Sequence, residues 1–176
     1  MSRNIMKRVI IDSSSLILMY KCGVIPHLLS FCIPVIPETV FSELTVQGHD
    51  GVDFFQELCA CGRILVCRPG KVEMQNFTGT LHVGEKDVIL LYHEGRGDYI
   101  VIDDRKGGAY CRDKSIPYIN AILGVKIFFM EHIISEEEFL QAWNFLVKNG
   151  RYSERIISWA ENAGKEALFD FIYHEK

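Results

Sequence analysis

The sequence lacks any apolar run long enough to span a membrane. Charged residues such as Asp12 and Lys21 interrupt each apolar stretch before it reaches the roughly 18 residues that a bilayer requires. The basic N-terminus precedes an apolar stretch that contains Asp12 and has no small-residue cleavage motif, so we expect no signal peptide. Both absences favour a protein that stays in the cytoplasm and does not bind a membrane.

The six cysteines lack the paired spacing of zinc sites and of secreted disulfide frameworks. We expect them to be reduced and mostly in the core. Cys59 and Cys61 form a C-x-C that could hold a metal, but no second pair accompanies them. Positive charge is not in excess either, since 19 Lys and Arg face 23 Asp and Glu. This balance argues against a broad basic surface for nucleic acid and leaves a local groove open.

The residues that are present suit one folded domain. Of the 176 residues, 48% are hydrophobic and 24% are charged, which is ordinary for a globular protein with a sizeable core. Short apolar runs predict strands at 8–11, 33–36, 63–67, 99–102 and 116–119, with helical patterns between them. This alternation predicts an α/β fold: a three-layer α/β/α sandwich with a central parallel sheet of four to five strands.

Helices are expected on both faces of this sheet and at its C-terminal end. One predicted helix enters through Pro37 and runs to about Gln47, and a polar stretch at 68–80 is expected to form a loop. Ser135 and Glu138 form a capping box that opens the first of two C-terminal helices. We divide the chain into a main domain, 1–134, and a helical extension, 135–176, packed on the same domain. Apolar residues of the extension either cover the sheet or form a surface for a partner.

Acidic residues gather where the predicted strands end. The set comprises Asp12, Asp103 and Asp104 after strands, Glu43 on the helix after Pro37, and Glu85 and Asp87 in the first turn of the helix that starts at Gly84. The carboxyl ends of parallel strands share one edge, where α/β proteins place their working crevice. Clustered carboxylates repel one another unless a hard cation neutralises them, and all-oxygen ligation suits Mg²⁺ or Mn²⁺. The joint pattern predicts a metal cradle.

Each acid taken alone has a simpler explanation. Asp12, followed by three serines, is typical of an N-cap at a strand-to-helix turn. Glu85 complements a helix dipole, and Glu43 alone fits a solvated helix position. The pair Asp103 and Asp104 could start a turn. Only the convergence of all of them on one edge favours a functional site.

Four segments carry these acids in order. They are "VIIDSSSLI" around Asp12, "IPETVFSEL" around Glu43, "LHVGEKDVILLY" around Glu85, and "VIDDRKGGAYC" around Asp103 and Asp104. Together they resemble the PIN domain, the nuclease fold of many prokaryotic toxin and RNA-processing proteins, over residues 8 to about 130. The combination of "GEKDVI" and "IDDR" is similar to a subgroup of PIN-like proteins with Gly-Glu-Ala-Glu-Ala-Ile and Asp-Asp motifs.

The resemblance implies a metal-dependent endoribonuclease that hydrolyses RNA. Its catalytic residues would be Asp12, Glu43, Glu85 and Asp104. Mg²⁺ or Mn²⁺ would be held by these four, with Asp87 and Asp103 as supporting or alternate ligands. Substrate contacts would come from Ser13, Ser14, Lys86, Arg105 and Lys106, although the serines could bond only to backbone and the basic residues could be solvated. The resemblance also implies the toxin of a toxin–antitoxin pair, with an antitoxin protein as partner, and a homodimer.

The sequence departs from the subgroup after the acidic pair. Gly107 and Gly108 stand where an Ala-Arg pair is usual, and Asn120 and Ala121 where a glycine-threonine-glycine turn would begin. The missing Arg puts phosphate contact and the integrity of that helix in doubt. This departure motivates the alternative of a catalytically weak or inactive module that binds nucleic acid or protein.

A phosphatase or receiver domain with Asp12 as nucleophile is the third hypothesis. Ser14 stands where haloacid-dehalogenase-type phosphatases need a second Asp. A receiver needs a lysine near the last strand, and Lys114 is only a loose match for it. Both readings are therefore disfavoured.

Overall fold

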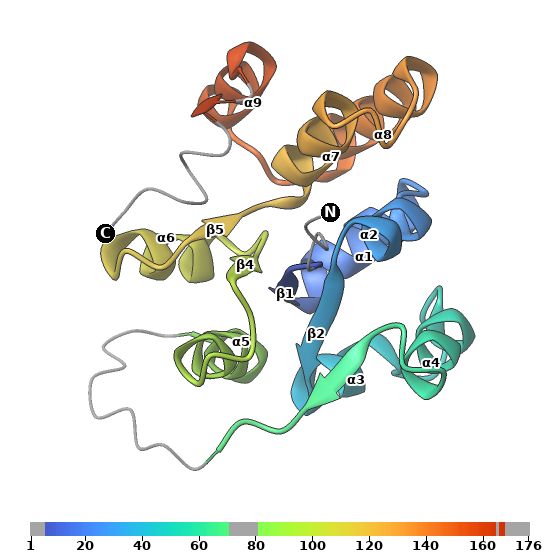
Figure 1. Cartoon of the computed structure of the whole chain (residues 1–176), viewed down its shortest axis with the longest axis vertical. Helices are drawn as coiled ribbons and strands as arrows, with labels where there is room; N and C mark the ends of the chain where they lie inside the picture. The colour runs from blue at the N-terminus through green and yellow to red at the C-terminus, as the bar shows by residue number, and fades with distance from the viewer. Residues whose placement is uncertain (1–5, 71–80, 165, 168–176) are drawn as a thin grey trace, which may run out of the picture.

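Five parallel strands form a single sheet at the centre of the protein. The computed structural model describes residues 6–70, 81–164 and 166–167. The strands within these residues are β1 (Arg8–Ile11), β2 (Ile33–Pro37), β3 (Leu65–Cys67), β4 (Tyr99–Val101) and β5 (Tyr118–Ile119), in the spatial order β3-β2-β1-β4-β5 (Figure 1). The predicted α/β class and parallel sheet are confirmed.

The strand order reverses between β1 and β4, at the middle of the sheet. β1 pairs with β2 on one side, where Val9 faces Pro34, and with β4 on the other, where Val9 faces Tyr99. The three residues of β4 and Val9 to Ile11 of β1 are buried, as expected for strands covered on both faces. A reversal of this kind opens a crevice at the carboxyl ends of the two strands, which are the ends that carry Asp12 and Asp103–Asp104.

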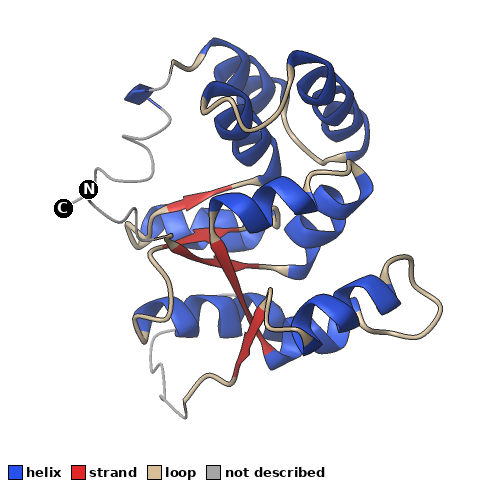
Figure 2. Cartoon of the chain, turned by 45° about the vertical axis from the view of Figure 1, so that its right-hand side comes forward, coloured by secondary structure: helices blue, strands red, loops and turns tan. Residues whose placement is uncertain are grey.

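Helices cover both faces of this sheet. Those of the described residues are α1 (Ser13–Lys21), α2 (Ile25–Phe31), α3 (Glu38–Leu44), α4 (Val52–Ala60), α5 (Val83–His93), α6 (Arg105–Asp113), α7 (Ala121–Met130), α8 (Glu136–Asn149) and α9 (Glu154–Asn162). α5 and α6 lie on one side of the strands, and α1, α2 and α7 lie on the other (Figures 1 and 2). The predicted three layers are confirmed.

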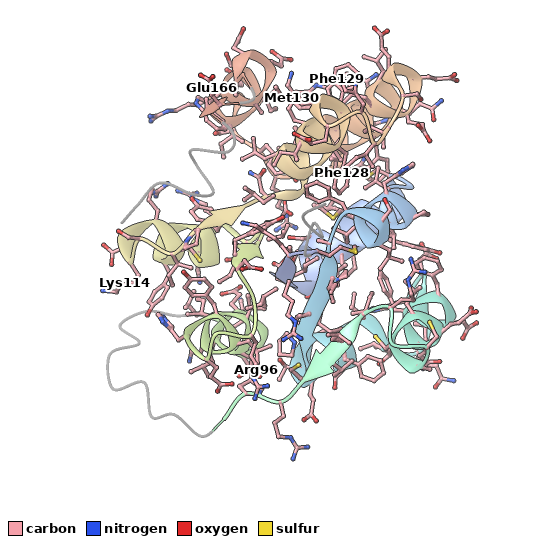
Figure 3. The ribbon with its side chains drawn as sticks, viewed as in Figure 1. Arg96, Lys114, Phe128, Phe129, Met130 and Glu166 are labelled. Carbon is pink, nitrogen blue, oxygen red and sulfur yellow. The ribbon has the colours of Figure 1, made fainter. Side chains whose placement is uncertain are left out.

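The C-terminal helices pack on α7. Figure 3 labels Phe128 and Phe129 on α7. Phe128 packs edge-to-face on Phe31 of α2, and Phe129 stacks on Phe139 of α8. The buried side chains that α8 and α9 contribute include Trp143. The capping box forms at the start of α8, where the backbone N–H of Ser135 donates to Glu138 Oε2 at 2.8 Å. Other apolar side chains of these helices are exposed: Leu140, Val147, Ile156 and Trp159.

Some predicted boundaries differ from the structure. Pro37 ends β2 and precedes α3, instead of standing in its first turn, because its ψ of 158° is extended. α3 ends at Leu44, where the N–H of Thr45 caps the last turn by donating to the Phe41 carbonyl, and does not reach Gln47. β3 begins at Leu65 instead of Arg63. Of the predicted loop at 68–80, residues 71–80 lie outside the described residues.

The remaining expectations concern thiols and membrane helices. All six cysteines are free, with Cys32 and Cys111 buried and Cys61 exposed. Within the described residues, no single helix is long and apolar enough to cross a membrane. Only α1 and α2 taken together, as a pair bent by 118°, match such a span in length and composition.

Candidate active site

A pocket of about 190 Å³ opens at the carboxyl edge of the sheet. Its lining consists of Asp12, Ser13, Ser14, Val40, Glu43, His82, Gly84, Glu85 and Asp104. The four carboxylates come from four places in the fold: the end of β1, α3, α5 and the end of β4. Elements far apart in sequence thus deliver the acids to a single cavity.

Asp12 is buried at the junction of β1 and α1. Its side chain is 4% exposed and its Oδ1 accepts a hydrogen bond of 2.8 Å from the N–H of Ser15, which caps α1. Burial first, and the nearby charge of Asp103 second, raise the pKa of Asp12 to about 7. Asp12 therefore caps a helix and also presents a poorly compensated carboxyl group to the pocket.

The adjacent acids Asp103 and Asp104 point in different directions, as successive residues of an extended chain do. Asp104 lines the pocket and caps α6, since its Oδ1 accepts from the N–H groups of Lys106 at 2.7 Å and Gly107 at 3.0 Å. Asp103 turns away from the pocket, where its Oδ2 accepts from the N–H of Ala121 at 2.9 Å and its Oδ1 accepts from the hydroxyl of Tyr152. Asp104 is thus the pocket residue of the pair.

Glu85 is held at the start of α5. Its side chain is 7% exposed, and its Oε2 accepts from the backbone N–H of His82 at 3.1 Å. Burial, and to a smaller degree the neighbouring Asp104, raise the pKa of Glu85. Asp87, two residues on, lies outside the pocket lining and accepts a hydrogen bond of 2.9 Å from Thr39 Oγ1.

Glu43 reaches the pocket from α3 and lies against α5. The Ser13 hydroxyl donates to Glu43 Oε2 at 2.5 Å, so this serine bonds to a pocket carboxylate and not only to backbone. A Cβ atom at Gly84 would lie 2.8 Å from Glu43 Oε1. The glycine of "GEKDVI" therefore leaves the space that the Glu43 carboxylate occupies.

The predicted basic residues do not neutralise this site. Lys86, Arg105 and Lys106 do not line the pocket, and the last two are exposed at the start of α6. Among the ion pairs of the described residues, none includes a pocket carboxylate. The pocket carboxyl groups therefore have no ion-pair partner within the described residues.

The donor set fits a hard divalent cation. Every acidic donor in the pocket is a carboxylate oxygen, the ligand type of Mg²⁺ and Mn²⁺. Burial is the main cause of the raised pKa values of Asp12 and Glu85, and a bound cation would favour their ionised forms. In the part of the chain that the structure describes, no three acidic, His or Cys side chains lie close enough to form a finished metal cluster. The pocket thus supplies the ligands without holding them in a closed coordination shell.

Reasoning from the sequence missed two residues beside these acids. His82 lines the pocket just ahead of α5, and its position three residues before Glu85 was a usable signal, since this is N-cap spacing. Tyr152 lies 49 residues from its partner Asp103, in the segment between α8 and α9. Nothing in the local sequence indicates that contact.

The comparisons with known proteins agree with this fold. A family model described as PIN domain matches residues 8–156, from β1 into the first turn of α9, and so extends beyond the four motifs. No curated protein and no solved structure matches the chain. PIN domains are generally nucleases, which places the protein at a coarse level among the hydrolases. Because the match covers most of the chain, the protein belongs to the PIN domain family.

Proposed function

We propose that the protein is a metal-dependent endoribonuclease that hydrolyses phosphodiester bonds in RNA. The observation that carries the proposal is the meeting of Asp12, Glu43, Glu85 and Asp104 in one pocket, at the point where the strand order reverses. Membership of a family of nucleases supports a hydrolase. RNA as the substrate and Mg²⁺ or Mn²⁺ as the cofactor are part of this proposal.

The four carboxylates would hold the cation. One carboxylate oxygen of Asp12 and one of Asp104 accept hydrogen bonds from backbone N–H groups in the first turn of a helix, which fixes the orientation of both side chains. Glu43 and Glu85 approach the pocket from α3 and α5. The bound cation supplies charge neutralisation at the phosphate and acidifies a water molecule. Glu43 is exposed and bonds to Ser13 through Oε2, which leaves its Oε1 for the cation, and one of the four carboxylates would orient the attacking water. Attack by water would leave 5′-phosphate ends.

RNA would approach over the rim of the pocket. Ser14 is exposed and lines the pocket, and Arg105 and Lys106 follow Asp104 on the surface. These groups would contact phosphates next to the cleaved bond, and Lys86, which is half-buried on α5, would do so from the other side. A local contact of this kind is compatible with the net charge of −4.

Cleavage of a labelled single-stranded RNA panel tests the proposal. Purified protein is assayed with Mn²⁺, with Mg²⁺ and with EDTA, beside Asp12→Asn, Asp104→Asn and the matched control Asp113→Asn, an exposed acid paired with Lys114. We expect cleavage that requires metal, disappears in the two pocket variants and persists in the control. Cleavage that survives EDTA or either pocket variant would contradict the assignment.

A module that binds nucleic acid or protein with little catalysis is the second candidate. The observation in its favour is that the pocket acids of the described residues stand apart and do not form a finished cluster. A folded wild-type protein that binds RNA equally well with Mn²⁺ and with EDTA, and never cleaves it, would decide for this candidate.

The cellular role follows from the same proposal. We infer a cytoplasmic toxin that an antitoxin protein neutralises, acting as a homodimer. The exposed apolar side chains on α8 and α9 offer surface for either contact. Induced expression should arrest growth, Asp12→Asn should abolish the arrest, and light scattering should report twice the chain mass of 20.2 kDa. A harmless wild type would rule out the toxin, and a monomer would rule out the homodimer.

A further inference from the structure

A hydrogen-bonded chain of residues leads from the C-terminal helices to the pocket. Tyr152 stands between α8 and α9, and its hydroxyl donates to Asp103 Oδ1. The other oxygen of Asp103 accepts from the N–H of Ala121 at 2.9 Å, and the next N–H of α7, that of Ile122, lies near the Tyr152 hydroxyl oxygen. The first turn of α7 and Tyr152 together fix the Asp103 carboxylate.

Asp103 in turn acts on Asp12. The backbone N–H of Asp103 lies beside the Asp12 carboxylate and lowers its pKa, and the charge of Asp103 is the largest effect of any neighbour on that group. The buried Ser15 hydroxyl lies beside both carboxylates and lowers the pKa of each, although it meets the geometry of a hydrogen bond with neither. The position of Asp103 therefore influences both the orientation and the charge of Asp12.

Gly150 makes the approach of Tyr152 possible. A Cβ atom at this position would lie 2.2 Å from Cε2 of the Tyr152 ring and 2.7 Å from the carbonyl oxygen of Leu146. The absence of a side chain lets the ring fold back over the end of α8. The segment Gly-Arg-Tyr that follows α8 thus places one hydroxyl group against Asp103.

We propose that Tyr152 is a positioning residue of the metal site, which orients Asp12 through Asp103 and so makes metal binding depend on the docked C-terminal helices. The inference rests on the proposed function, because it concerns the same carboxylates. Without the hydroxyl, the Asp103 carboxylate keeps its bond to Ala121 and can turn about it, so its position beside the Asp12 carboxylate is no longer fixed. Groups that orient metal ligands typically contribute about 10- to 100-fold to metal affinity. Since Tyr152 acts through one intermediate residue, we expect about tenfold.

Calorimetric titration of the full chain with Mn²⁺ tests this role. Tyr152→Phe removes one hydroxyl, and Tyr20→Phe makes the same change at the far end of α1, where the ring packs on Phe54 and Phe55. We expect Kd for Mn²⁺ to rise about tenfold in Tyr152→Phe and to stay unchanged in Tyr20→Phe. In RNA cleavage, kcat should fall and KM for RNA should hold, because Tyr152 does not line the pocket. Gly150→Ala, which keeps the hydroxyl but displaces the ring, should weaken Mn²⁺ binding in the same direction.

A double-mutant cycle separates positioning from plain loss of stability. Asp103→Asn should weaken Mn²⁺ binding by itself, and adding Tyr152→Phe to it should weaken binding no further, since both act through one link. Equal Kd values for wild type and a folded Tyr152→Phe, or additive effects in the cycle, would overturn the inference while leaving the nuclease proposal intact. A folded wild type that binds no Mn²⁺ would overturn both.

Discussion

The carboxylate of Asp103 lies close enough to that of Asp12 for its charge to disfavour the ionisation of Asp12, although only Asp12 lines the pocket. Burial is the larger cause of the raised pKa of Asp12, and the charge of Asp103 is next. In the protein without bound metal, ionisation of the Asp12 carboxyl group therefore lowers the stability of the fold. A cation in the pocket would offset this free-energy cost. Without a cation, the stability of the fold should depend on pH.

The first prediction concerns this pH dependence. Because the pKa of Asp12 is about 7 in the fold and near 3.8 without it, the folded state binds more protons between these values. The free energy of unfolding in EDTA should therefore fall as pH rises from about 4 to 7, with Asp103 and Glu85, whose pKa values are also raised, acting in the same direction. Urea unfolding at pH 5, 6, 7 and 8, the last in the absence and presence of Mn²⁺, measures the trend.

Two comparisons make that measurement decisive. Excess Mn²⁺ at pH 8 should restore part of the lost free energy, because a ligand that binds only the folded state stabilises it. Asp12→Asn should show a shallower fall than wild type. A wild-type stability that rises from pH 5 to 7 in EDTA, or an unchanged slope in Asp12→Asn, would mean that the Asp12 carboxyl is not held in its neutral form.

The second prediction is that Asp12→Asn stabilises the metal-free protein at pH 8 while abolishing cleavage. The amide carries no charge to bury, and its oxygen can still accept from the N–H of Ser15. Each pKa unit corresponds to about 1.4 kcal/mol, so a gain on the order of 1 to 3 kcal/mol remains after imperfect replacement of the carboxylate. Urea unfolding in EDTA reports the gain. A variant less stable than wild type at pH 8 would count against the charge argument.

The fold class could be predicted from the sequence because a short run of apolar residues marks each central strand. The runs at 9–11 and 99–102 are continuously apolar, as strands buried on both faces must be, and the structure places them at the middle of the sheet. The errors fall at boundaries that depend on tertiary contacts. β3 pairs with β2 alone and is only partly buried, so its polar neighbour Arg63 gave no clear limit. Pro37 is compatible with a strand end and with a helix start, and the sequence does not choose between them.

The site was accessible where an acid directly follows a strand. Asp12 and Asp104 stand at strand ends, Glu43 and Glu85 were expected at the same edge from their places on predicted helices, and the resemblance to PIN domains gave the four their catalytic role. Which acid of a pair faces the pocket was not accessible, because neighbouring residues alternate and their partners are distant. Asp103 is turned aside by Tyr152, and Asp87 bonds to Thr39, which lies 48 residues away.

The third prediction separates activity from stability at Gly84. In Gly84→Ala the new methyl group would meet Glu43 Oε1 at 2.8 Å, and this exposed side chain can only move out of the pocket. Alanine is favoured over glycine inside a helix by roughly 0.5–1 kcal/mol, which offsets the local crowding. We expect RNA cleavage and Mn²⁺ affinity to fall by at least about tenfold while the melting temperature changes little.

Gly164→Ala is the matched control, since a Cβ atom there meets no atom of the described residues within 4 Å. It should leave cleavage, Mn²⁺ binding and melting unchanged. Wild-type Mn²⁺ affinity in Gly84→Ala would show that Glu43 is not a ligand.

The fourth prediction explains the unusual pair Gly107 and Gly108. α6 forms in spite of both glycines, so the doubt about this helix is removed. A Cβ atom at Gly107 would lie 2.2 Å from Cδ1 of the buried Ile102, whereas one at Gly108 would lie 3.3 Å from Cε2 of Tyr118, a half-buried ring. Gly107→Ala should destabilise the protein by about 1–3 kcal/mol through overpacking, and Gly108→Ala should be nearly neutral. Thermal unfolding of both variants compares them directly. Equal stabilities would show that α6 shifts freely against the sheet.

The most direct test of the central claim is anomalous X-ray diffraction from crystals of the full chain grown with Mn²⁺. The account predicts an anomalous peak in the pocket, with carboxylate oxygens of Asp12 and Asp104 at about 2.1 Å, near the distances of oxygen ligands to small divalent cations. Glu43 or Glu85 should complete the set of protein ligands, and Asp103 should keep its hydrogen bond from the Tyr152 hydroxyl. A fully occupied peak elsewhere, or an empty pocket at saturating Mn²⁺, would contradict the assignment of these carboxylates to a metal centre.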